Sequence, residues 1–300
     1  ASGNRLIPLS ETETSPDILP NRYKQLADLI RFYEPVKLLE TGTWNAGRAI
    51  EMSLAAFDNA DSVHYIGYDL FEDATAATDR EEFNGKPHNT EAAVRNRLEE
   101  FKEHMKKEKD KEFSFELHRG NVRDTLDKNT VKNIDFALIG SGNSLKTVQH
   151  EYDILKDVPV VVADHYFTKD EDDGIPDEEY RGVKEVFDKV PTKKMDAQET
   201  TEDGWTTFDE EAVTRKYILP SGDKVADGGH THLVVFLHDD ELGEVPEDLK
   251  RVPIVVHPRD CVPKDYIKNN IQTNMKLLGS DKWVQKHVPH STMGVIVSAG

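Results

Sequence analysis

Cysteine and long apolar runs are the two most conspicuous absences from the sequence. Its 300 residues include one cysteine, Cys261, which cannot form a disulfide within the chain and has no second thiol for a shared metal ion. No stretch approaches the roughly 18 apolar residues that a membrane-spanning helix needs. The amino terminus lacks the charged-then-apolar pattern of a secretory signal. These absences predict a cytoplasmic protein with no part in the membrane.

Positive charge is also scarce. Lys and Arg number 38 against 57 Asp and Glu, and the formal net charge is −19. Such a surface repels phosphate backbones and anionic lipid heads, so we expect no nucleic acid as a main partner. Hydrophobic residues make up 37% of the chain, which is enough for a sizeable core. The composition is compatible with a globular protein that takes a small-molecule substrate, and it leaves a homo-oligomer open.

Short apolar runs alternate with segments of helical periodicity through the first half of the chain. This alternation predicts a parallel sheet covered by helices on both faces. The expected strands are Val36–Leu39, Val63–Tyr68, Phe113–Leu117, Ile134–Ile139 and Val158–Ala163, and the expected helices between them are Arg48–Phe57, Thr90–Lys107 and Leu145–Lys156.

Further elements follow this core. We expect a helix over Tyr180–Val190, a strand at Lys193–Gln198 and a late strand at Thr231–His238. Between the two strands, Ser221-Gly-Asp223 has the composition of a hairpin tip. The sequence therefore predicts a terminal strand pair after the parallel strands.

The two ends of the chain differ in composition from the middle. Residues 1–20 are polar and broken by prolines, which predicts a flexible arm. Residues 21–240 form the expected main domain, and residues 241–300 form a proline-punctuated extension. The final run, Met293–Gly300, is either an edge strand or the first strand of a further domain.

A glycine-containing turn follows the first expected strand. The residues Leu38-Leu-Glu-Thr-Gly-Thr-Trp-Asn-Ala-Gly47 lead from that strand into a helix, where α/β proteins bind ligands. Gly42 allows the backbone to turn tightly beside a ligand, and Gly47 keeps the helix start close to the strand. A carboxylate at Glu40 would repel the pyrophosphate of a dinucleotide and attract an ammonium group. The turn therefore favours S-adenosylmethionine as the cofactor. The alternative, a nicotinamide cofactor, would make the chain a dehydrogenase, and Glu40 argues against it.

A second carboxylate ends the next expected strand. Asp69 closes Val63-His-Tyr-Ile-Gly-Tyr-Asp69 and is placed to accept both hydroxyls of a ribose. Taken alone it could equally cap a helix, but with Glu40 it predicts a nucleoside site.

The motif Glu40-Thr-Gly-Thr-Trp-Asn-Ala-Gly47 resembles the Glu-Thr-Gly-x-Trp-x-Gly-Gly motif of macrocin O-methyltransferase-like enzymes. Those enzymes methylate sugar hydroxyls with S-adenosylmethionine and a divalent metal. The resemblance implies a Rossmann-like class I methyltransferase domain of the α/β class, with a mainly parallel seven-stranded sheet whose last strand is antiparallel. It implies cofactor contacts from Glu40, Gly42, Trp44, Gly47, Asp69 and Asn121, the last beside the adenine.

The resemblance breaks where the fourth strand ends. There the related enzymes carry an acid that binds the metal together with an acid after the fifth strand, but this chain has Gly140-Ser-Gly-Asn143. Asp164 is the one matching acid, and a single carboxylate with neutral oxygens makes a poor Mg²⁺ site. His165, beside Asp164, is the candidate general base that would remove a proton from an acceptor hydroxyl.

Two functional hypotheses follow. The first is an S-adenosylmethionine-dependent O-methyltransferase that acts on a glycan or another small hydroxyl acceptor. The second is a domain that binds S-adenosylmethionine, has lost catalysis and serves as a scaffold or sensor in a glycan-modifying protein. His230 and His232 could share a Zn²⁺ ion, but no third ligand is marked by spacing, and we expect a structural role.

Overall fold

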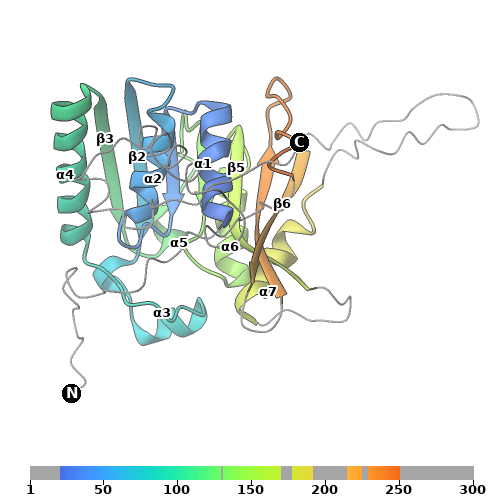
Figure 1. Ribbon diagram of the computed structural model, residues 1–300. Helices are drawn as coiled ribbons and strands as arrows, with labels where there is room; N and C mark the ends of the chain where they lie inside the picture. The colour runs from blue at the N-terminus through green and yellow to red at the C-terminus, as the bar shows by residue number, and fades with distance from the viewer. Residues whose placement is uncertain (1–20, 130, 170–177, 192–214, 225–228, 251–300) are drawn as a thin grey trace, which may run out of the picture.

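A computed structural model of the chain describes residues 21–129, 131–169, 178–191, 215–224 and 229–250. Its elements occur in an alternating order with a strand pair at the end (Figure 1). They are α1 (Asn21–Tyr33), β1 (Lys37–Thr41), α2 (Gly47–Ala56), β2 (Ser62–Asp69), the 3-10 helix η1 (Phe71–Asp73), α3 (Ala76–Glu81), α4 (Glu91–Lys109), β3 (Glu112–Arg119), α5 (Val122–Thr125), β4 (Phe136–Ile139), α6 (Leu145–Leu155), β5 (Val160–Lys169), α7 (Glu178–Phe187), β6 (Arg215–Lys224) and β7 (Gly229–Leu237).

The seven strands form one sheet in the order β3-β2-β1-β4-β5-β7-β6. The pairs from β3 to β5 are parallel, whereas β7 runs antiparallel to both β5 and β6. This is the mainly parallel, Rossmann-like methyltransferase arrangement that the sequence predicted, and the predicted fold class is confirmed.

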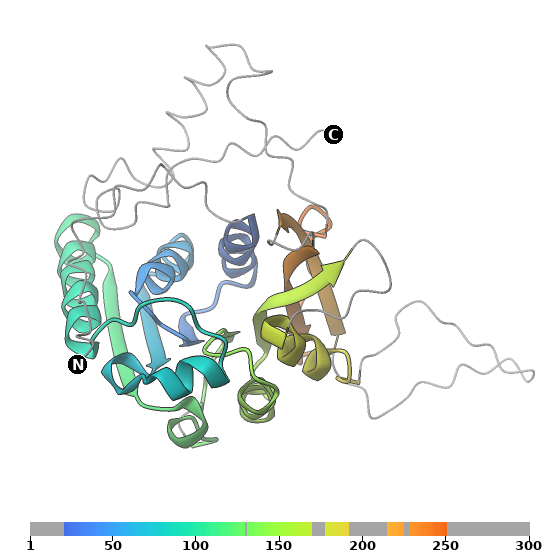
Figure 2. The same cartoon turned by 90° about the horizontal axis from the view of Figure 1, so that it is seen from below.

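Helices cover both faces of the sheet, as Figure 2 shows from below. Alternate residues of β1 serve the two sides: Leu38 packs with α1, α2 and α4, and Leu39 packs with α5, α6 and α7. β4 is buried at all four positions, as a central parallel strand should be. The two apolar layers fix the carboxyl ends of the parallel strands at one edge of the sheet.

One predicted element differs from the structure, and several others lie outside the described residues. Ser221-Gly-Asp223 is not a hairpin tip, because it lies inside β6 at a shift in its register with β7. The predicted strand Lys193–Gln198, the arm and residues 251–300 lie outside the described residues. Residues 241–250 are described, and their Val245 and Leu249 belong to the same core as α1. Among the described residues, no helix combines the length and hydropathy needed to cross a bilayer.

β1 and β4 are the strands between which a ligand site is expected. After β1 the chain adds β2 and β3 on one side, and it then returns to place β4 and β5 on the other. A crevice opens at the carboxyl edge where the strand order reverses in this way. The segment of residues 70–90, with η1 and α3, leaves β2 at that same edge.

Candidate functional site

The turn after β1 packs tightly against the end of β4. Gly42 has a φ of 83°, and a Cβ there would collide with the backbone of Gly140. Trp44 and Ala46 also have positive φ values, of 51° and 64°. Because non-glycine residues seldom adopt this conformation, the turn is held in its shape by its surroundings.

Glu40, at the end of β1, is completely buried. Its Oε1 accepts a hydrogen bond from Arg48 Nε at 2.5 Å, and its Oε2 accepts one from the Tyr65 hydroxyl at 2.5 Å. Burial raises the pKa of the Glu40 carboxyl, and the Arg48 guanidinium opposes that rise. The sequence predicted a ligand's ammonium beside this carboxylate, but the structure places a guanidinium of the chain itself there.

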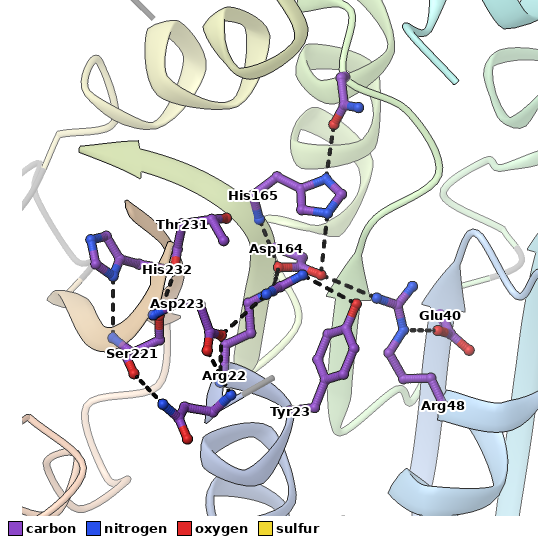
Figure 3. A network of polar contacts seen from close by, with 12 residues as sticks. Arg22, Tyr23, Glu40, Arg48, Asp164, His165, Ser221, Asp223, Thr231 and His232 are labelled. Carbon is purple, nitrogen blue, oxygen red and sulfur yellow. Dashed lines mark hydrogen bonds and ion pairs between the residues drawn. The ribbon is translucent and has the colours of Figure 1, made fainter. Parts of the chain in front are cut away.

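Arg48 links β1 to β5 across the end of β4. Besides Glu40 it contacts Asp164 Oδ2 at 3.3 Å through Nη1 (Figure 3). Its Nη2 also donates to the Gly42 carbonyl at 3.2 Å. A Cβ on Gly140 would lie 3.2 Å from Arg48 Nη2. The related enzymes carry an acid at the position of Gly140. In this chain the Arg48 guanidinium occupies the space that such an acidic side chain would take.

Asp164, in β5, is also completely buried in its side chain and lies between two arginines. Arg22, from the first turn of α1, donates from Nε to Asp164 Oδ1 at 2.8 Å. Burial alone would raise the pKa of this carboxyl, but His165, Arg22 and Arg48 together hold that pKa well below its usual range. Asp164 is thus a permanently ionised carboxylate whose charge is already balanced.

The residues at this edge do not fit a divalent metal. Each oxygen of Asp164 faces a guanidinium, and Gly140 supplies no oxygen-bearing side chain. Within the ranges that the structure describes, no group of three His, Cys, Asp or Glu residues could hold a metal ion. A hard cation would need several oxygen ligands and would be repelled by both arginines.

His165 lies on a bulge of β5. The register with β7 shifts between Ala163 and Tyr166, and His165 has a φ of 67°. Bulges of this kind redirect a side chain next to functional sites. The imidazole Nδ1 lies 3.1 Å from Asn143 Oδ1, and Nε2 lies 3.7 Å from Asp164 Oδ2.

The protonation of His165 follows from its surroundings. Burial lowers the pKa of the imidazole, and the Asp164 carboxylate opposes part of that change. An amide oxygen can only accept, so with this Asn143 orientation Nδ1 carries the hydrogen and Nε2 is the basic atom. The structure therefore turns the His165 imidazole toward the Asp164 carboxylate, and the role of His165 as a general base stays a prediction.

Asp69 ends β2 and faces the turn after β1. Its Oδ2 accepts from the Trp44 backbone N–H at 2.8 Å, and its Oδ1 accepts from the Phe71 N–H at 2.8 Å. Trp44 itself is 40% exposed, and its indole Nε1 donates to the Pro87 carbonyl at 2.9 Å. A carboxylate has about four acceptor positions, so Asp69 retains capacity for further donors.

Asn121 follows β3 next to this carboxylate. The Gly120 N–H donates to the Asp69 carbonyl at 3.0 Å, which places Asn121 beside the end of β2. The Asn121 side chain caps α5 by accepting from the Arg123 N–H at 3.0 Å. The turn with Gly42, Trp44 and Gly47, together with Asp69 and Asn121, thus lies along the ends of neighbouring strands, where the sequence predicted it.

Sequence reasoning missed Arg48 and four further residues of the site. Arg22 and Tyr23 come from α1, with the Tyr23 ring 4.7 Å from the Arg22 Cζ and 5.6 Å from the Arg48 Cζ. Asp223 of β6 pairs with Arg22 and caps the start of α1. Glu82 accepts from Ser144 and Thr147 at the start of α6. None of these contacts leaves a periodic or spacing signal, because each joins segments far apart in the chain.

The paired histidines of β7 have structural partners. His232 bonds through Nε2 to the Thr168 hydroxyl at 2.7 Å and through Nδ1 to the Ser221 N–H at 3.2 Å. The His230 and His232 rings stack with centroids 6.2 Å apart. Both ring nitrogens of His232 are therefore engaged by the sheet.

The chain is similar to several solved structures, but sequence comparisons found no match. No protein-family model matches the sequence, and no curated protein matches it. The O-methyltransferase TomG from Streptomyces achromogenes, in complex with SAM, is 14% identical with a TM-score of 0.45 over 74% of this chain and 82% of that one. An O-methyltransferase from Bacillus cereus, in complex with SAH, is 13% identical with a TM-score of 0.43 over 75% and 84%. The O-methyltransferase NovP is 20% identical with a TM-score of 0.39 over 58% and 74%. No sequence family is assigned to the chain.

Proposed function

We propose that the chain is an S-adenosylmethionine-dependent O-methyltransferase whose acceptor is a sugar or another small hydroxyl compound. One observation carries the proposal: the Gly42 turn, Asp69 and Asn121 end three neighbouring parallel strands beside the crevice at the strand-order reversal. Ligands of doubly wound sheets bind at this place. The similarity of residues 40–47 to the macrocin O-methyltransferase-like motif supports a sugar as acceptor.

The residues present fit the nucleoside part of this cofactor. Asp69 has acceptor capacity left for the ribose hydroxyls, Asn121 would lie beside the adenine, and the Gly42 turn and Gly47 would run along the ligand. Gly67, opposite Glu40 in the sheet, has no side chain, and a Cβ there would collide with Thr43 and Tyr65 under the turn. The bound cofactor would supply an electrophilic methyl group on a sulfonium.

The chain's own residues would prepare the acceptor. His165 Nε2 would accept the proton of the acceptor hydroxyl, and Asn143 would hold the imidazole in the tautomer that leaves this atom basic. Asp164 would stabilise the imidazolium formed, because its ionised carboxylate lies 3.7 Å from Nε2. No step needs a metal ion, since the guanidinium groups of Arg22 and Arg48 already balance the charge of Asp164.

A second function is favoured by one contact. The bond between Arg48 and Glu40 occupies the carboxylate that was expected to hold the cofactor's ammonium. A domain that binds a nucleoside weakly and does not transfer a methyl group would keep such a contact. This alternative is an S-adenosylmethionine-binding scaffold or sensor.

Methyl transfer separates the two functions. The purified chain is incubated with tritium-labelled S-adenosylmethionine and a panel of glycans and nucleotide sugars, and transfer to an acceptor is counted. An enzyme labels at least one acceptor, and His165→Gln lowers the rate by about 100-fold, the usual contribution of a general base. His104→Gln, on the remote helix α4, is the matched control. Cofactor binding without any labelled acceptor would favour the scaffold.

A further inference from the structure

The charges of the site are layered, with the carboxylates inside and the guanidinium groups outside. The side chains of Glu40 and Asp164 have no exposed surface, whereas those of Arg48 and Arg22 are 18% and 13% exposed. Figure 3 shows the two arginines meeting around Asp164 and Tyr23. A ligand that approaches Glu40 and Asp164 therefore meets the two guanidinium groups before it meets these carboxylates.

The guanidinium groups also retain donors. Arg48 uses Nε on Glu40, one N–H of Nη1 on Asp164 and one of Nη2 on Gly42, so one N–H on each terminal nitrogen has no acceptor among the described residues. Arg22 uses Nε on Asp164, one Nη1 hydrogen on Asp223 and one Nη2 hydrogen on the Tyr23 hydroxyl, which also leaves one N–H on each terminal nitrogen. A guanidinium with two such N–H groups matches the geometry of a carboxylate.

The structure also argues that Arg48 stays in place. Its guanidinium has three acceptors, and two of them belong to carboxylates with no contact to water. Removing one partner from a buried ion pair has a large free-energy cost, because it leaves an uncompensated charge away from water. An entering ammonium group would have to overcome that cost to reach Glu40.

We infer that Arg48, supported by Arg22, is a carboxylate-binding subsite. This inference rests on the proposed function: the methionine part of the cofactor is held by its carboxylate on Arg48, not by its ammonium group on Glu40. The subsite thereby reverses the polarity that the sequence of the turn predicts. The same subsite could take a carboxylate of the acceptor, and the experiment distinguishes the two sources.

Three ligands test this polarity in the unmodified protein by calorimetry. They are S-adenosylhomocysteine, its analogue with the ammonium replaced by hydrogen, and its analogue with the carboxylate replaced by hydrogen. Loss of the carboxylate should weaken binding at least 10-fold, and loss of the ammonium less than threefold. The reverse order, or equal weakening, overturns the assignment to the cofactor while the proposed function stands.

Variants assign the effect to the residue. Arg48→Met should bring the affinities of S-adenosylhomocysteine and the analogue without a carboxylate within threefold of each other. Arg48→Lys is the second variant, for use if Arg48→Met does not fold, because it keeps the positive charge. It should retain part of the preference for the ligand with a carboxylate. Arg31→Met, an exposed arginine of α1 paired with Asp28 and Asp58, is the control and should keep the full preference. A preference that survives both Arg48 variants overturns the inference.

A measurement without any nucleoside separates this inference from the proposed function. Acetate is titrated into nitrogen-15-labelled protein against chloride at equal ionic strength, and the side-chain Nε–H signals are followed. Specific shifts of the Arg48 and Arg22 signals are expected, with none for Arg31. If S-adenosylhomocysteine does not bind but these shifts occur, the proposed function fails and the subsite takes the carboxylate of a different ligand. If acetate produces no specific shift, the subsite itself is wrong.

Discussion

Gly140 and Arg48 share one small volume at the end of β4. A Cβ at position 140 would lie 3.2 Å from Arg48 Nη2, so the side chain of Gly140→Asp would meet the guanidinium directly. We expect the new carboxylate to pair with Arg48 and not to create a Mg²⁺ site.

Calorimetric titration with Mg²⁺ checks this expectation. Gly140→Asp alone should give no binding heat, and the double variant Gly140→Asp with Arg48→Ala should bind the ion measurably, because Glu40 Oε1 and Asp164 Oδ2 then lose their guanidinium partner while Arg22 still holds Asp164 Oδ1. Tight Mg²⁺ binding by the single variant would contradict the account of Arg48.

Glu151 lies beside the turn that follows β4, and its carboxyl is completely buried. Burial raises its pKa to about 7, with Glu82 adding to the rise and hydrogen bonds from Ser141 and Thr41 opposing it. In the unfolded chain the pKa returns to the ordinary value of 4.5. Between these two values the folded protein binds more protons than the unfolded one, so stability falls as pH rises through this window.

The expected size is on the order of 3 kcal/mol, from about 1.4 kcal/mol for each pKa unit. Urea unfolding at pH 4.5 and pH 7.5 measures it. Glu151→Gln, which keeps an acceptor for Ser141, should remove this part of the pH dependence, and Glu103→Gln on the exposed face of α4 should not. Identical pH profiles for the wild type and Glu151→Gln would show that Glu151 ionises normally.

Single residues were predictable where the chain order itself places them. Glu40, Asp69 and Asn121 follow strands, and their position at one edge comes directly from parallel pairing. The partners of those residues were not predictable. Arg48 reaches Glu40 from within a helix, and Arg22 reaches Asp164 across 142 positions of the chain. A pairing of this kind depends on the packed fold and leaves no pattern in local sequence.

At the level of elements, Glu82 ties the segment of residues 70–90 to α6. Its carboxylate accepts from the Ser144 N–H at 3.0 Å, the Ser144 hydroxyl at 2.9 Å and the Thr147 hydroxyl at 2.5 Å. An anion at a helix start is favoured by the free N–H groups and the helix dipole. α3, in the same segment, has no buried residue, so polar contacts provide much of its attachment.

Glu82→Ala should therefore loosen this segment more than it destabilises the protein. We expect at least 10-fold faster hydrogen exchange over residues 76–90, and a loss of about 1–2 kcal/mol in the free energy of unfolding. Glu81→Ala is the matched control, because its exposed ion pair with Arg123 contributes little. Equal exchange rates in the two variants would show that Glu82 does not hold the segment.

The elements most readily predicted were those with a buried face. The parallel strands and the helices α2, α4 and α6 lie within a few residues of their expected bounds, because apolar periodicity marks them. β5 continues past Ala163 through the bulge to Lys169, where polar residues hide its pairing with β7. α3 was not predicted, since a helix with no buried face has no apolar period.

For the whole molecule, the strand order and the charge layering point to different parts of one ligand. Under the proposed function, the ends of β1, β2 and β3 would provide the groups for a nucleoside, and the arginines over Glu40 and Asp164 would provide the groups for an anion. The net charge of the chain is −19, so the paired guanidinium groups of Arg22 and Arg48 contrast with the charge of the whole molecule. The fold class followed from the sequence, and so did the position of Glu40, Asp69 and Asn121 at one edge of the sheet, whereas the pairing of Glu40 with Arg48 required the packed structure.

The central claim is that the Gly42 turn and Asp69 hold an adenosyl nucleoside. Calorimetric titration of the wild-type chain with S-adenosylhomocysteine and with NAD tests it most directly, with Asp69→Asn as the site variant and Asp61→Asn, an exposed position beside β2, as control. The account predicts micromolar binding of S-adenosylhomocysteine, at least 10-fold weaker binding by Asp69→Asn, and none of NAD. Preference for NAD, or S-adenosylhomocysteine binding that is unchanged in Asp69→Asn, would contradict it.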